Sequence, residues 1–113
     1  MVAAPADSSS DTPADASSQV KVCVVDAGCS WAATPGSGDV LSGLAGALVA
    51  ESVGHAGPDA ELPLSALMET AVRAAVIHAS AADIAAETED GYAPTSASVI
   101  AEAIPRARAR LQM

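Results

Sequence analysis

The sequence predicts an α/β fold in which a short strand or hairpin is followed by about three helices. Residues 20–25 form a β-branched, apolar run bounded by Asp26-Ala27-Gly28, which is typical of a strand that ends in a turn. Residues 39–52 and 64–87 repeat apolar side chains at three- and four-residue steps, as amphipathic helices do. Segments containing glycine and proline separate these elements and are expected to be loops.

Residues 1–19 differ in composition from the rest of the chain. They consist mainly of Ala, Ser, Asp, Pro and Thr and show neither helical nor strand periodicity. Such a segment buries too little apolar surface to offset the conformational entropy lost on ordering. We therefore expect a disordered tail at 1–19 and one folded portion at 20–113.

The first helix is expected at 39–52, with Leu41, Leu44 and Leu48 on one face. A second face made of glycine and alanine would allow another element to pack closely against it. Residues 53–63 contain two glycines and two prolines, so we expect a surface loop that also contains His55, one of the two histidines of the chain.

The second helix is expected at 64–87, with Ser65 as its N-cap. A polar turn around Gly91 should follow at 88–95. A last helix should begin near Ser96 or Ser98 and be interrupted at Pro105, because proline removes a backbone donor and clashes with the preceding turn. The arginines near the chain's end should offset the helix dipole; they are Arg106, Arg108 and Arg110.

Charge and aromatic content argue against several classes of function. The formal net charge is −9, from 14 acidic and 5 basic side chains, and this balance repels nucleic-acid phosphates and anionic lipid surfaces. The chain has one Trp, one Tyr and no Phe, so it lacks an aromatic platform for single strands. We expect no nucleic-acid or membrane partner, and a thin core of small aliphatic side chains.

The two cysteines, Cys23 and Cys29, match neither a zinc-site spacing nor a redox C-x-x-C motif. Reduced thiols are expected, and no residues are assigned to a metal site. A leader pattern and a long apolar run are both missing from the sequence, so we expect a cytoplasmic protein.

The chemistry is expected in residues 34–43, T-P-G-S-G-D-V-L-S-G. Glycines at 36 and 38 allow a positive φ and a close approach of the backbone to a bound group. The first N–H groups of a helix lack internal partners and lie at the positive end of its dipole, where they stabilise a phosphate or an oxyanion. Gly36, Ser37 and Gly38 are therefore candidates for nucleotide-phosphate binding, and Asp39 is a candidate base. Considered alone, these residues are better explained as a tight turn with a capping aspartate.

A longer string decides between these interpretations. Residues 31–44, W-A-A-T-P-G-S-G-D-V-L-S-G-L, resemble the C-terminal signature of the NAD(P)H-hydrate dehydratases, a branch of the ribokinase-like superfamily. Residues 46–50 resemble the helix that follows in this family, residues 75–87 its histidine-bearing second helix, and residues 95–105 its closing segment. The resemblance covers the chain from about Val20 onward and implies the C-terminal part of a ribokinase-like, three-layer α/β fold.

What the resemblance implies is a lyase that repairs hydrated NADH or NADPH. In this family ADP or ATP, used with Mg²⁺, phosphorylates the ring hydroxyl, and loss of phosphate restores the dinucleotide. Asp39 would be the catalytic residue, contacting the substrate and acting on its hydroxyl. Gly36, Ser37 and Gly38 would bind the nucleotide. His78 matches a histidine of the family, but a histidine beside an apolar helix face is more often a packing residue, so it is not included in the expected site.

Two other functions stay open. A small-molecule kinase of the same superfamily is the first, although Ser37 and Val40-Leu41 are typical of the dehydratases. A non-catalytic remnant or an interaction subunit is the second, because the family places the rest of its nucleotide and substrate sites upstream of residue 20. Besides the small-molecule substrate, the partner would then be a second copy or a companion chain that supplies the missing lobe.

Overall fold

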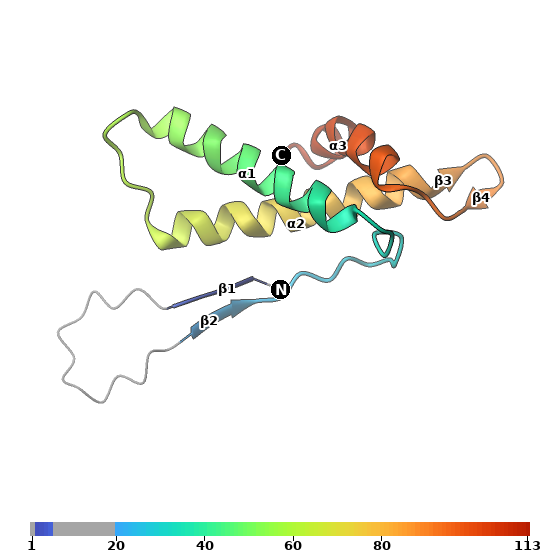
Figure 1. Ribbon diagram of the computed structural model, residues 1–113, viewed down its shortest axis with the longest axis horizontal. Coiled ribbons are helices and arrows are strands. Elements are labelled where there is room, and N and C mark those ends of the chain that lie inside the picture. The colour runs from blue at the N-terminus through green and yellow to red at the C-terminus, as the bar shows by residue number, and fades with distance from the viewer. Residues whose placement is uncertain (1, 6–19) are drawn as a thin grey trace.

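Three helices and four short strands make up the part of the chain that the computed structural model describes, which is residues 2–5 and 20–113. The helices are α1 (Ser37–Ala56), α2 (Leu64–Ala86) and α3 (Ala97–Leu111), and the strands are β1 (Val2–Pro5), β2 (Val20–Cys23), β3 (Glu87–Thr88) and β4 (Gly91–Tyr92). Figure 1 shows the helices packed together, with β1 and β2 beneath α2 and the β3–β4 hairpin at one end. The expected α/β order, a short strand followed by three helices, is confirmed.

Strands β1 and β2 pair antiparallel, with Val2 opposite Cys23 and Pro5 opposite Val20. The structure thus differs from the expected tail at Val2–Pro5, because pairing with β2 satisfies backbone groups that composition alone would leave to water. The rest of the tail prediction, at residues 1 and 6–19, falls outside the described residues.

Helix α1 is longer than expected at both ends. It begins at Ser37, directly after Gly36, and continues through His55 to Ala56. Gly57 ends it with a φ of 96°, while its N–H donates to the carbonyl of Val53. His55 therefore belongs to a helix and not to a loop, and its Nδ1 lies 2.7 Å from the main-chain oxygen of Glu51.

Helix α2 is capped by Pro63 and not by Ser65. The carbonyl of Pro63 accepts hydrogen bonds from the N–H groups of Ala66 and Leu67, at 3.0 and 3.2 Å, so the helix begins one residue before the serine. At its other end Glu87 leaves the helical conformation to form the β3–β4 hairpin. The polar turn expected around Gly91 is thus a short antiparallel pair.

The expected interruption of the last helix at Pro105 is wrong. Helix α3 runs without a break from Ala97 to Leu111, with Pro105 inside it and exposed to solvent. Proline costs this helix one backbone hydrogen bond. The opposite side of α3 is buried through Ile100, Ala103 and Ala107, and this packing holds the helix together across the proline.

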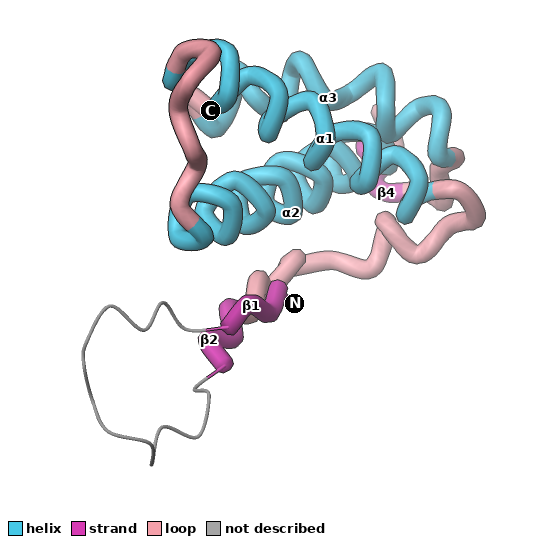
Figure 2. Tube along the Cα trace, turned by 60° about the vertical axis from the view of Figure 1, so that its left-hand side comes forward, coloured by secondary structure: helices cyan, strands magenta, loops and turns pink. Residues whose placement is uncertain are grey.

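The core is formed where the helices meet, and it is built from small aliphatic side chains as expected. One large side chain of each helix is almost completely buried: Leu48 of α1, Ile77 of α2 and Ile100 of α3. Alanines fill most of the remaining core and allow the helices to approach closely. In Figures 1 and 2, α2 lies between the β1–β2 pair on one side and the other two helices on the other. Helix α2 is therefore the element around which the described part is packed.

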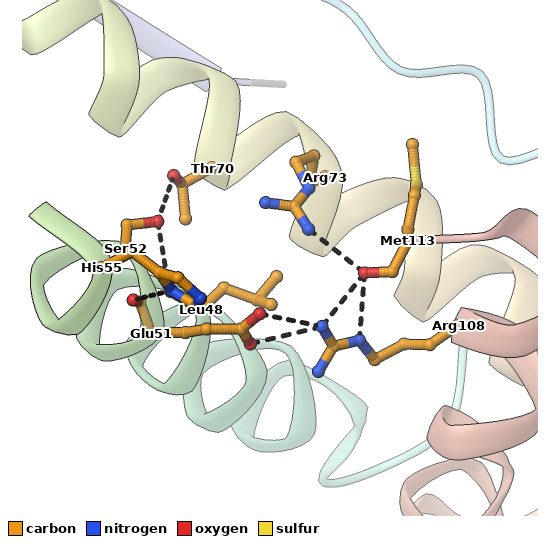
Figure 3. Close-up of polar contacts among 8 residues, drawn as sticks. All are labelled: Leu48, Glu51, Ser52, His55, Thr70, Arg73, Arg108 and Met113. Carbon is orange, nitrogen blue, oxygen red and sulfur yellow. Dashed lines mark hydrogen bonds and ion pairs between the residues drawn. The ribbon is translucent and has the colours of Figure 1, made fainter.

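Polar contacts tie the three helices together near the end of α1, as Figure 3 shows. The Nη2 of Arg108 lies 3.2 Å from both carboxylate oxygens of Glu51, which joins α3 to α1. The guanidinium groups of Arg73 and Arg108 both donate to the main-chain oxygen of Met113, at 3.0–3.2 Å. Arg108 thus bridges two helices, in addition to lying in the last turn of α3, where a positive charge offsets the dipole.

Several apolar or small side chains stay uncovered in the described part. Val20, Val22 and Val24 are more than half exposed, and the small-residue face of α1 contacts no further element of that part; this face comprises Gly43, Gly46, Ala47 and Ala50. None of the described helices is long and apolar enough to cross a membrane.

Candidate functional site

The glycine turn, residues 34–39, forms the start of α1 as the sequence predicts. Gly36 is the N-cap residue, with a φ of 85° and a ψ of −8°, and no side chain caps the helix. The Asp39 and Val40 N–H groups both donate to the carbonyl of Gly36, at 3.1 and 3.2 Å, and Ser37 N–H donates to the carbonyl of Thr34. This left-handed conformation favours glycine, because a Cβ would collide with the following carbonyl.

Two N–H groups of the turn are left without a partner. Among the described residues, neither Gly36 N–H nor Gly38 N–H donates a hydrogen bond. Gly38 is also open on its outer side, since a Cβ built there would meet no atom within 4 Å. The turn therefore offers backbone donors and unfilled space together, as an anion-binding turn requires.

Ser37 lies between the two glycines but points into the protein. It is 4% exposed, and its Oγ lies 3.0 Å from Nε2 of His78, which is also buried. The same Nε2 lies 3.0 Å from the main-chain oxygen of Ser37. Ser37 thus forms a hydrogen bond with α2 through His78, whereas the backbone N–H groups of Gly36 and Gly38 on either side of it have no partner in the described residues.

Asp39 is exposed, and its carboxylate makes no hydrogen bond within the described part of the chain. It lies in the first turn of α1, one residue after the unpartnered N–H of Gly38. A carboxylate there is favoured by the positive end of the helix dipole. Because no other residue of the described part forms a hydrogen bond with this carboxylate, Asp39 is available to accept a proton from a bound hydroxyl.

The start of α3 lies beside the start of α1. The segments that lead into the two helices run side by side in the same direction. They are in contact at three pairs of residues, and the two members of each pair are the same number of residues apart in the sequence. The pairs are the stacked rings of Trp31 and Tyr92, the hydrogen bond from Thr34 Oγ1 to the carbonyl of Thr95, and the close approach of Gly36 to Ala97. Figure 1 shows both helices starting near the β3–β4 hairpin.

The second helix start adds further unpartnered donors. In the described residues, the N–H groups of Ala97, Ser98 and Val99 have no hydrogen-bond partner, whereas Ile100 N–H donates to the carbonyl of Ser96. Two positive helix ends therefore lie next to each other at the glycine turn. Sequence reasoning missed this arrangement, because it depends on a contact between segments far apart in the chain.

Other features of the described part do not coincide with this site. A pocket of about 310 Å³ lies between residues 25–29 and the Val76, Ser80 and Asp83 side of α2, and none of the expected site residues lines it. No group of three or more His, Cys, Asp or Glu side chains within residues 2–5 and 20–113 is arranged to hold a metal ion.

Comparison with known proteins identifies the family of the chain. A family model described as NAD(P)H-hydrate dehydratase, a carbohydrate-kinase type, matches residues 10–106. The chain belongs to this family. The family is ribokinase-like, and the present chain corresponds to its C-terminal part. Its glycine turn, Asp39 and His78 all lie inside the matched region.

Two curated relatives are named as NAD(P)H-hydrate repair enzymes. A bifunctional NAD(P)H-hydrate repair enzyme Nnr of Corynebacterium glutamicum is 52% identical over 98 residues, which is 81% of this chain and 17% of the relative. The enzyme of the same name from Mycobacterium leprae is 49% identical over 86 residues, 75% of this chain and 16% of the relative. The chain thus spans about a sixth of the length of these relatives. No solved structure matches it.

Proposed function

We propose that this chain provides the phosphate-binding turn and the catalytic base of a nucleotide-dependent NAD(P)H-hydrate dehydratase. The observation that carries the proposal is the pair of unpartnered N–H groups at Gly36 and Gly38. They lie directly before Asp39, whose carboxylate is exposed and has no hydrogen-bond partner in the described part of the chain. The family match and the printed names of the relatives support repair of hydrated NADH or NADPH as the reaction.

The glycine turn would bind the phosphate of ADP or ATP that is transferred. Phosphoryl transfer develops charge on the equatorial oxygens, and fixed backbone donors stabilise that charge without reorganisation. The free N–H groups at the adjacent start of α3 would add donors for a second oxygen or phosphate. Mg²⁺ would come with the nucleotide and balance the remaining charge, since the described part offers no cluster of metal-ligating side chains.

Asp39 would act on the substrate hydroxyl. Its carboxylate accepts the hydroxyl proton as the oxygen attacks the terminal phosphorus, and the bond from phosphorus to the bridging oxygen of the nucleotide breaks. Loss of the phosphate from the ring, with loss of a ring proton, then restores the double bond of NADH or NADPH. A positioned general base contributes about 10²- to 10⁴-fold to the rate.

The proposal is tested by calorimetric titration of the purified chain with ADP, ATP and AMP in the presence of magnesium. Gly38→Val is the decisive variant, because its side chain would fill the open space in front of the turn without meeting an atom near Cβ. Gly46→Val is the matched control, since Gly46 lies in the same helix, is also exposed and also has no atom near its missing Cβ. We expect saturable binding of ADP or ATP that is lost in Gly38→Val and kept in Gly46→Val.

A second candidate function is that of an interaction subunit that is non-catalytic by itself and whose site is completed by a companion chain. The exposure of Asp39, whose carboxylate has no hydrogen-bond partner within the described part of the chain, favours it. If the folded wild-type chain binds no nucleotide, titration is repeated with the upstream part of the Corynebacterium glutamicum relative added as a companion chain. Binding only in the mixture supports this second function, and absence of binding in both contradicts nucleotide dependence.

A further inference from the structure

The contact between His78 and Ser37 links α2 to the glycine turn. A single atom, Nε2 of His78, lies 3.0 Å from the Ser37 hydroxyl oxygen and 3.0 Å from the Ser37 main-chain oxygen. Both residues are more than nine-tenths buried. Both contacts go to the residue that lies between the two unpartnered N–H groups of the site.

The chemistry of the two oxygens indicates which group is the donor. A main-chain carbonyl oxygen only accepts hydrogen bonds, so Nε2 of His78 must carry the hydrogen that points towards it. The imidazole then shares this single hydrogen between the two oxygens of Ser37. This donor holds the orientation of the Ser37 peptide group and of its side chain at the same time.

Apart from its contacts with the start of α3, the start of α1 has few other restraints. No side chain caps it, and its N-cap glycine is in a left-handed conformation. Thr70, another buried polar residue of α2, donates within its own helix to the carbonyl of Ala66, at 2.8 Å. Outside α2 its hydroxyl oxygen lies 3.5 Å from the hydroxyl oxygen of Ser52. In the described part of the chain, His78 is therefore the buried polar side chain by which α2 holds the glycine turn.

We propose that His78 is a positioning residue that holds the first turn of α1 in the conformation that presents the N–H groups of Gly36 and Gly38. Its hydrogen bonds to Ser37 act on the turn whether or not a ligand is bound. The consequence for nucleotide binding rests on the function proposed above, whereas the effect on the turn does not. His78 does not touch the reacting atoms in this role.

The test compares three variants of the chain. His78→Leu removes the donor and keeps a similar volume, while His78→Gln places an N–H donor the same number of bonds from Cα as Nε2. Thr70→Val is the control, because it removes a buried polar group from the same helix that does not contact the turn. Amide hydrogen exchange is followed by NMR without any ligand, at Ser37, Asp39 and Val40, whose N–H groups are bonded within the turn.

Protection of these three amides is expected to fall about tenfold in His78→Leu relative to the amides of the helix core, as for loss of one buried hydrogen bond. His78→Gln should restore most of the protection, and Thr70→Val should leave the ratio unchanged. Equal loss of protection in the turn and in the core, or no recovery in His78→Gln, would overturn the positioning role. If His78→Leu does not fold, Ser37→Ala replaces it, and a local loss of about threefold is expected because one acceptor remains.

A nucleotide titration separates this inference from the proposed function. If ADP binds to the wild type, we expect about tenfold weaker binding by His78→Leu, near-normal binding by His78→Gln and unchanged binding by Thr70→Val. If ADP binds to neither the wild type nor a mixture with a companion chain, the proposed function fails, while the exchange data still decide the positioning role. Normal binding by His78→Leu together with unchanged exchange would overturn it.

Discussion

Gly36 and Ala97 approach so closely that a Cβ built on the glycine would lie 3.2 Å from the Cβ of the alanine. The first residue of α3 therefore packs against the N-cap residue of α1. Gly36 meets two requirements at once, because its φ of 85° disfavours any side chain and the neighbouring helix leaves little room for one. The position of the glycine turn thus depends on the packing of a helix from the other end of the sequence.

Gly36→Ala should lower the free energy of unfolding by about 2 kcal/mol, from the left-handed backbone together with the contact at Ala97. Gly38→Ala is the control, since a Cβ there meets no atom within 4 Å, and it should change stability by less than about 0.5 kcal/mol. Urea unfolding followed by circular dichroism measures both. Equal effects of the two substitutions would contradict the packing described here.

Tyr92→Ala should destabilise the protein by about 1 kcal/mol. The ring stacks on Trp31 with centroids 5.8 Å apart and planes 13° from parallel, and such pairs contribute about 0.5–1.5 kcal/mol beyond the area they bury. Tyr92→Phe keeps the ring and should stay near the wild type. Trp31 fluorescence reports the change directly, and an unaltered emission spectrum in Tyr92→Ala would argue against the stacking.

Pro105→Ala should raise the free energy of unfolding by about 1 kcal/mol. The substitution restores a backbone donor inside α3 and relieves the clash with the preceding turn, although it also increases the entropy of the unfolded chain. Pro94→Ala, outside the helices, is the control and should not stabilise. A loss of stability in Pro105→Ala would mean that the proline is not an unfavourable residue in this helix.

Glu51→Gln should cost less than about 0.5 kcal/mol although Glu51 is paired with Arg108 at 3.2 Å. Both side chains are more than one-third exposed, and exposed ion pairs contribute little in water. Arg108→Met should cost more, about 1 kcal/mol, because it also removes the donors to the Met113 main-chain oxygen. Thermal unfolding at low and high salt tests this order, and a large, salt-sensitive loss in Glu51→Gln would contradict it.

Asp39→Asn separates binding from chemistry. The side chain is exposed and unpaired in the described part, so stability should change by less than about 0.5 kcal/mol. Loss of a negative charge beside the glycine turn should leave ADP binding unchanged or tighter, while turnover of the hydrated dinucleotide falls at least about 10²-fold. A variant that binds nucleotide normally and keeps full turnover would exclude Asp39 as the base.

Local chemistry made much of the fold predictable. The apolar spacing of α2 and the β-branched run of β2 express local preferences, and both elements lie where expected within a few residues. The errors concern element ends and breaks. Pro105 was expected to interrupt the last helix, and it does not, because burial of Ile100 and Ala103 outweighs one missing hydrogen bond.

The sequence by itself determined the glycine turn, the aspartate that follows it and the membership of the family, because these depend on residues adjacent in the chain. Only the tertiary structure decided that His78 bonds to Ser37 and that α3 begins beside Gly36. These contacts join segments distant in sequence, and they form only when the buried faces of the three helices pack together. Backbone conformation is a local property, whereas the environment of a turn depends on which other segments the packing of the core places beside it.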